Sequence, residues 1–201
     1  VRSLVGLIPL FAVERLEENW IKPFKSFNAD LEWFFKHRKA LVEKTITTVE
    51  QYGEKVHVLT ILDPDQIASL LKTVNDPAEF RSDYGLRSLS KFHEKHPFHL
   101  DDQCVGYEPG ESIALLKGGN SNWRGPVWFP ISFMLIESVR KLRKGYGGIL
   151  ATRNAEGTRE HINLQALSSN IAEGLLNIFK RDESGRRPVF GDEEKFQNDP
   201  H

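Results

Sequence analysis

Residues 118–130 read GGNSNWRGPVWFP and end where the strongest helical pattern of the chain begins. Pro126 suits the first position of a helix, and Pro130 is tolerated only in the first turn, where amide groups are unpaired. The sequence therefore predicts a helix from about Pro126 and leaves Trp123 and Arg124 on the preceding loop. The apolar face of this helix comprises Trp128, Ile131, Leu135, Val139 and Leu142.

Helical periodicity also dominates on both sides of this stretch. We expect helices over residues 4–16, 27–38, 64–74 and 160–180, and a cap at Gly145 for the helix that follows the loop. We also expect a β-hairpin over 45–62, an extended segment over 98–107 and a surface loop over 151–158. Together these elements predict a mainly helical fold, in which a ring of long helices joined by elaborate loops carries a site on one rim.

Composition and charge exclude several classes of protein. The 27 basic and 28 acidic residues leave a net charge of −1, which argues against nucleic acid as the main partner. The single cysteine, Cys104, has no internal disulfide partner, and no Cys/His spacing is typical of zinc, so we expect no metal and no cofactor. The default expectation is a cytoplasmic setting. The apolar run over residues 4–11 is shorter than the roughly 20 residues of a membrane span.

The two ends of the chain predict that residues 1–201 form a partial domain. The only methionine is Met134, and Val1 leads directly into an apolar run. The last residues, FQNDPH, show no closing element. We therefore expect the domain to be incomplete at both ends.

The aromatic loop requires either a ligand or a burial partner. Leaving Trp123 and Trp128 in water is costly, and a sugar ring offers the flat apolar face that an indole on a loop would cover. On a helix, positions 123 and 128 would point about 140° apart, so one buried stripe does not accommodate both. We interpret Trp128 as shared between core and pocket and Trp123 as the better ligand contact. Arg124 either binds substrate or pairs with an acid beneath the loop.

Other charged clusters are better explained as solvated turns. Glu193 and Glu194 lie in a charged run, as do Asp101 and Asp102. The three histidines at 93, 96 and 99 surround Pro97 and lack a cysteine or carboxylate that would complete a tetrahedral zinc site.

Several segments resemble family 63 of the glycoside hydrolases. They are residues 120–128 (NSNWRGPVW), 83–90 (DYGLRSLS), 186–191 (RRPVFG) and 194–197 (EKFQ). The chain is most similar to the bacterial branch grouped with processing α-glucosidases and mannosylglycerate hydrolases, and the resemblance runs through essentially the whole chain. The Trp-Arg-Gly-Pro-x-Trp segment is its most specific part.

The resemblance implies an (α/α)6 toroid and hydrolysis of an α-glycosidic bond in gluco- or mannosides with inversion. In the family, the acid lies well upstream of residues 2–4 and the base follows the Asp-Pro-His segment, so both catalytic carboxylates are expected outside this chain. The matching substrate-binding residues are Trp123, Arg124, Trp128, Asn122, Gly125 and Arg87. Expected partners are an oligosaccharide or small glycoside and the remainder of the parent polypeptide.

Two alternatives from other classes stay open on the sequence. One is a helical module that binds carbohydrate without catalysis and keeps the aromatic rim alone. The other is a structural helical scaffold in which the Trp-Arg-Gly-Pro loop serves only for packing.

Overall fold

The computed structural model describes residues 1–101, 103–110, 123–147, 150–153 and 159–199. The chain divides into two compact units. The first unit comprises Val1–Leu4, Asp76–Ile136 and Ser169–His201, and the second comprises Val5–Asn75 and Glu137–Ser168. Helices hold more of the described residues than strands do, which agrees with a mainly helical class, while the ring of helices stays a prediction. Within the described part, no helix is long and apolar enough to cross a bilayer.

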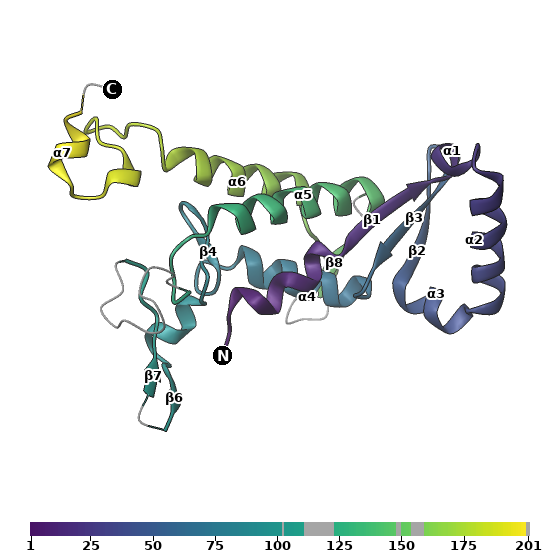
Figure 1. Ribbon diagram of the computed structural model, residues 1–201, viewed down its shortest axis with the longest axis horizontal. Helices are drawn as coiled ribbons and strands as arrows, with labels where there is room; N and C mark the ends of the chain where they lie inside the picture. Colours follow the sequence, from purple (N-terminus) through teal and green to yellow (C-terminus); the bar gives the residue numbers. More distant parts are fainter. Residues whose placement is uncertain (102, 111–122, 148–149, 154–158, 200–201) are drawn as a thin grey trace. The chain divides into compact units, whose positions relative to one another are not determined.

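The second unit contains a three-stranded antiparallel sheet in the order β1–β3–β2 (Figure 1). The strands are β1 (Val13–Glu17), β2 (Ile46–Gln51) and β3 (Glu54–Thr60). Tyr52 and Gly53 link β2 to β3 with φ angles of 52° and 81°. Positive φ at both positions is typical of a type I′ turn, whose twist matches that of the strands. The predicted hairpin is therefore confirmed, and β1 adds a third strand to it.

The expected helix over residues 4–16 is wrong. The chain instead forms a 3-10 helix, η1 (Leu4–Phe11), and then enters β1. Leu4, Leu7 and Leu10 are buried, and their spacing of three is the period of a 3-10 helix. Pro9 lies inside η1 and lacks the N–H that an α-helix would use. The extended conformation beyond η1 is stabilised because β1 pairs with β3 along its whole length.

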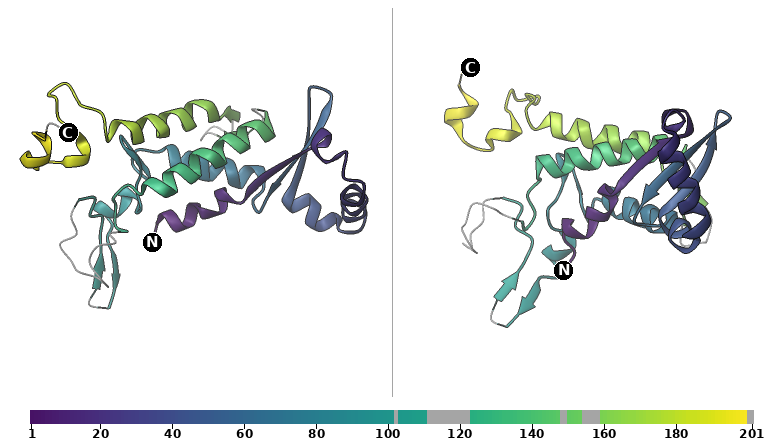
Figure 2. Two further views of the ribbon diagram at one scale, coloured as in Figure 1. Left: turned by 45° about the horizontal axis from the view of Figure 1, so that its top comes forward. Right: turned by 45° about the vertical axis from the view of Figure 1, so that its right-hand side comes forward.

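Four helices complete the first half of the second unit. They are α1 (Glu18–Ile21), α2 (Lys25–His37), α3 (Lys39–Thr45) and α4 (Pro64–Asn75). Figures 1 and 2 show α2 and α3 on the β2 side of the sheet. Asp63 caps α4, because its Oδ1 accepts the N–H of Gln66 at 2.8 Å while Gln66 Oε1 accepts the N–H of Asp63 at 3.1 Å. This reciprocal capping box fixes the start of the predicted helix.

The two longest helices, α5 (Phe129–Tyr146) and α6 (Leu164–Asn177), each run through both units. Helix α5 begins at Phe129 rather than at Pro126, and the carbonyl of Trp128 accepts the N–H of Ser132 at 3.0 Å. Trp123 and Arg124 thus lie outside the helix, as predicted. The expected start of the last helix at 160 is wrong, because Arg159–His161 form a strand, β9, paired with β8 (Ala151–Arg153).

The predicted cap of α5 at Gly145 is also wrong. The helix continues to Tyr146, and Gly147 ends it with a φ of 58° and an N–H that donates to the Arg143 carbonyl at 3.0 Å. Gly145 has a packing role instead. A Cβ at this position would lie 2.8 Å from Val58 of β3, so the missing side chain lets the helix approach the sheet closely.

The first unit is built from short elements around the ends of α5 and α6. They are β4 (Arg81–Ser82), β5 (Gly85–Leu86), η2 (Lys91–Glu94), β6 (Phe98–Leu100), β7 (Gln103–Val105), η3 (Pro188–Phe190) and α7 (Glu194–Gln197). The predicted extended segment is thus a hairpin of β6 and β7. A Cβ on Gly85 would lie 3.2 Å from Ser132 Oγ of α5 and 3.1 Å from Leu175 of α6. The β4–β5 hairpin is therefore wedged between these two helices.

Candidate functional site

Trp123 and Trp128 stack on each other at the start of α5. Their ring centroids are 4.0 Å apart, and the ring planes are inclined by 27°. Trp128 is half-buried, whereas Trp123 remains 43% exposed. Both residues precede the helix, so their side chains need not point about 140° apart as they would on a helix. The pair presents a flat apolar surface to solvent, carried mainly by Trp123.

Arg124 ties this surface to the interior of the first unit. The residue is only 8% exposed, and its Nη2 lies 3.1 Å from Glu108 Oε2. The main chains of the two residues are also joined, because the N–H of Glu108 donates to the Arg124 carbonyl at 2.5 Å. The alternative that Arg124 pairs with an acid beneath the loop is therefore confirmed, and the acid is Glu108.

Gly125 allows the loop to pack against the segment that carries Glu108. Its φ is 144°, a backbone conformation that residues other than glycine rarely adopt. A Cβ here would lie 2.8 Å from the Tyr107 ring and 3.0 Å from the backbone of Pro109. The N–H of Gly125 donates to Ser88 Oγ at 3.0 Å. Gly125 thus lets the loop pack closely against Tyr107 and Pro109 while its N–H binds Ser88.

Arg87 is engaged by acceptors of the protein itself. Its Nε donates to the Tyr107 hydroxyl at 2.9 Å. Its Nη1 donates to the carbonyl of Pro77 at 3.0 Å and also to that of Arg81. The backbone of Arg87 pairs with Val127 in an isolated β-bridge. The backbone of Arg87 therefore joins the segment after β5 to the loop, while its guanidinium is engaged by Tyr107 and by two carbonyl groups.

The structure brings most of the residues predicted for the site into one region of the first unit. Trp123, Arg124, Gly125 and Trp128 share one loop, and Arg87 supports that loop through Tyr107. Asn122 lies outside the described residues. Sequence reasoning missed Tyr107 and Glu108; a signal was available in the Tyr-Glu-Pro-Gly run that precedes the glycine-rich stretch.

The charged clusters set aside on the sequence have local roles. Glu194 is exposed and receives a hydrogen bond from Arg186 at 2.6 Å, which holds the pKa of Glu194 below its ordinary value. Glu193 Oε1 accepts the N–H of Lys195 at the start of α7. His93 is buried, with Nε2 accepting the N–H of Arg2 and Nδ1 bonded to the His96 carbonyl. In the described ranges, no three His, Cys, Asp or Glu side chains are grouped to hold a metal. Asp102 lies outside those ranges.

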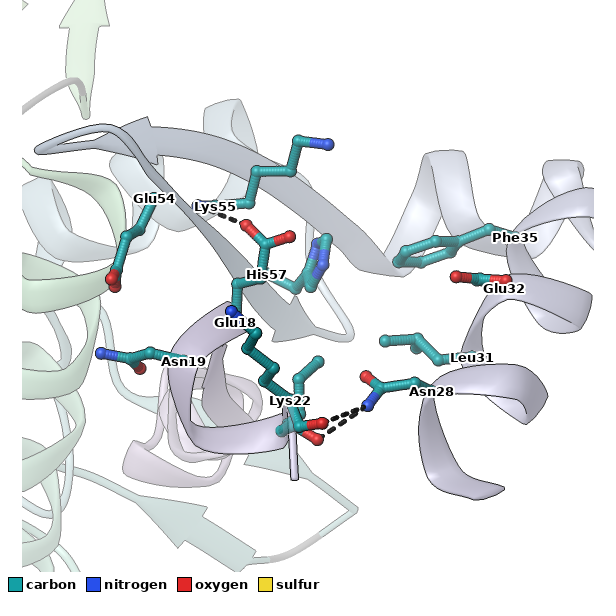
Figure 3. Close-up of a pocket in the computed structure, with 11 residues that line it drawn as sticks. Glu18, Asn19, Lys22, Asn28, Leu31, Glu32, Phe35, Glu54, Lys55 and His57 are labelled. Atoms are coloured by element: carbon teal, nitrogen blue, oxygen red, sulfur yellow. Dashed lines mark hydrogen bonds between the residues drawn. The ribbon is translucent and has the colours of Figure 1, made fainter. Parts of the chain in front are cut away.

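A separate cleft of about 580 Å³ lies in the second unit. Figure 3 shows it between α2 on one wall and α1 with β3 on the other. The sequence analysis did not predict this cleft, because its lining residues come from segments that are separate in the sequence. The lining comprises Glu18, Asn19, Ile21, Lys22, Asn28, Leu31, Glu32, Phe35, Glu54, Lys55 and His57.

The comparisons with known proteins place the chain among the glycoside hydrolases. Residues 24–176 match the mannosylglycerate hydrolase MGH1-like glycoside hydrolase domain. The chain belongs to this family.

Two curated relatives extend the comparison. The chain is 37% identical over 209 residues to an uncharacterised protein of Saccharomyces cerevisiae, a match that covers 100% of this chain and 19% of that protein. It is 26% identical over 107 residues to a probable mannosyl-oligosaccharide glucosidase of Schizosaccharomyces pombe, covering 46% of this chain and 11% of that protein. The chain thus spans a fifth or less of the length of these relatives. Both are from yeasts, and the narrower assignment to a bacterial branch stays a prediction. No solved structure matches the chain.

Proposed function

We propose that this chain forms part of the catalytic domain of a glycoside hydrolase that cleaves α-glycosidic bonds in gluco- or mannosides. The main support is the exposed Trp123, stacked on Trp128 in a loop of a chain that belongs to a glycoside hydrolase family. In this proposal the outer face of Trp123 covers the apolar face of a sugar ring in an oligosaccharide or small glycoside, and Trp128 backs it.

The proposal gives the other predicted residues a role behind that wall. Arg124 and Gly125 hold the loop through Glu108, Tyr107 and Ser88, and Arg87 supports Tyr107. Asn122 adjoins Trp123 in the sequence and remains proposed as a sugar contact. These residues orient the loop and take no part in proton transfer.

Catalysis is proposed to proceed with inversion in an (α/α)6 domain completed by the remainder of the parent polypeptide. An inverting enzyme needs one carboxylic acid to protonate the leaving oxygen and a second carboxylate to activate water on the opposite face. We propose that both carboxylates lie outside this chain. The chain then supplies the binding wall that presents the glycosidic bond to them.

The stereochemistry of the first product tests this proposal. The intact protein is incubated with a panel of α-glucosides and α-mannosides, and the anomeric protons of the released sugar are followed by ¹H NMR. We expect the β-anomer to appear first and the α-anomer only as the sugar equilibrates. Initial release of the α-anomer would contradict inversion, and no release from any member of the panel would contradict the hydrolase assignment.

A further inference from the structure

The cleft in the second unit combines an apolar wall with polar groups that converge on it. Asn28, Leu31, Glu32 and Phe35 project from α2 at intervals of three and four, so they share one face of the helix. Leu31 and Phe35 are half-buried and form the apolar part of this wall. The amide of Asn28 closes one end, because its Nδ2 donates to the Ile21 carbonyl at 2.8 Å (Figure 3).

His57 lies on the opposite wall and is only 8% exposed. Its Nδ1 is 2.9 Å from Thr48 Oγ1, and its ring meets Phe35 edge-on with centroids 5.0 Å apart. Burial lowers the pKa of His57, against the opposing effect of the Glu18 carboxylate. The imidazole is therefore neutral at neutral pH, and with Nδ1 engaged by Thr48 it retains one ring nitrogen for a further hydrogen bond.

The charges that line the cleft favour an uncharged ligand. Figure 3 shows the carboxylates of Glu18 and Glu32 on opposite walls, a placement that repels an anion such as phosphate. With Glu54 the lining holds three carboxylates against the ammonium groups of Lys22 and Lys55, so its net charge is small and negative. A ligand that both accepts and donates hydrogen bonds, and that offers an apolar face to Leu31 and Phe35, matches this lining. A volume of about 580 Å³ is within the range of small-molecule sites.

We propose that this cleft binds the ring of a neutral gluco- or mannoside, as a second sugar site distinct from the Trp123–Trp128 pair. Phe35 and Leu31 cover the apolar face of the ring, while Glu18 and Glu32 bond its hydroxyls. The choice of a sugar rests on the proposed function, since the same lining would suit other neutral polyols.

The test follows sugar binding at both places in one sample of the intact protein. Maltose and methyl α-mannoside are titrated separately while NMR records the His57 ring C–H signals and the Trp123 indole N–H signal. We expect the His57 signals to shift with at least one sugar, both in the wild type and in Trp123→Ala. In the variant Glu32→Ala the apparent affinity at His57 should fall at least about tenfold. Glu32 is exposed, so the fold should survive.

Glu43→Ala is the matched control, because Glu43 is an exposed acid on α3 that does not line the cleft. This variant should leave the His57 response unchanged. Shifts at Trp123 without any at His57 would overturn the second site and leave the proposed function standing. Shifts at His57 without any at Trp123 would support the cleft and count against the proposed wall. Shifts of His57 with inorganic phosphate but with neither sugar would overturn the ligand class.

Discussion

Replacing Trp123 with alanine is expected to weaken maltose binding by the intact protein at least about tenfold, which corresponds to about 1.4 kcal/mol. The indole is 43% exposed and rests on Trp128 at 4.0 Å, so its removal takes away the outer face of the pair. The part of the sugar-dependent fluorescence quenching that comes from Trp123 should disappear with it. Isothermal titration calorimetry and fluorescence titration measure the two effects, and Trp123→Phe should recover part of the affinity because a smaller flat ring remains.

Trp33→Ala is the control for this prediction. Trp33 is 52% exposed on α2 and stacks on His37 with a centroid distance of 4.8 Å, so it matches Trp123 in exposure and in having a ring partner. We expect this variant to bind maltose like the wild type. Equal losses in the two variants would mean that exposed indoles contribute without specificity, and an unchanged affinity in Trp123→Ala would make the loop a packing element.

Replacing Gly125 with alanine is expected to destabilise the first unit by about 3 kcal/mol. The new Cβ would lie 2.8 Å from the Tyr107 ring and 3.0 Å from the backbone of Pro109, and backbone atoms have little room to move. The φ of 144° adds strain for any residue with a side chain. Urea unfolding of the intact protein measures the change, and sugar binding should weaken in parallel because Trp123 is two residues away.

Gly185→Ala separates strain from steric clash. Gly185 has a φ of 81°, yet nothing lies within 4 Å of a Cβ placed there. This variant should therefore show only the strain contribution, about 1 kcal/mol. If Gly125→Ala is no more destabilised than Gly185→Ala, then Tyr107 and Pro109 do not confine the loop as the structure indicates.

Local signals predicted the elements whose ends are set by their own residues. The capping box joins Asp63 to Gln66, three residues later, and the two-residue turn consists of Tyr52 and Gly53. The apolar stripe of α5 was likewise sufficient to predict the helix, and Pro126 and Pro130 left Trp123 on the preceding loop. These features depend on contacts within a few residues, which periodicity captures.

Non-local pairing explains the elements that were predicted wrongly. Residues 13–17 form a strand because they pair with β3, which lies more than thirty residues away in the sequence. Gly145 looks like a cap in the sequence, yet its role depends on the distant Val58. The stacking of Trp123 on Trp128 and the pairing of Arg124 with Glu108 also require a loop path that sequence periodicity does not describe.

The indole N–H signals of the four tryptophans of this chain test the central claim most directly. They belong to Trp20, Trp33, Trp123 and Trp128, and single Trp→Phe substitutions in the intact protein assign them. When maltose or methyl α-mannoside is titrated, we expect the Trp123 signal to shift most and the Trp128 signal to follow it, whereas any shift of Trp20 or Trp33 reports the cleft beside them. A response confined to Trp20 or Trp33, or no response from any of the four with either sugar, would contradict the proposal that this loop is the wall of a glycosidase site.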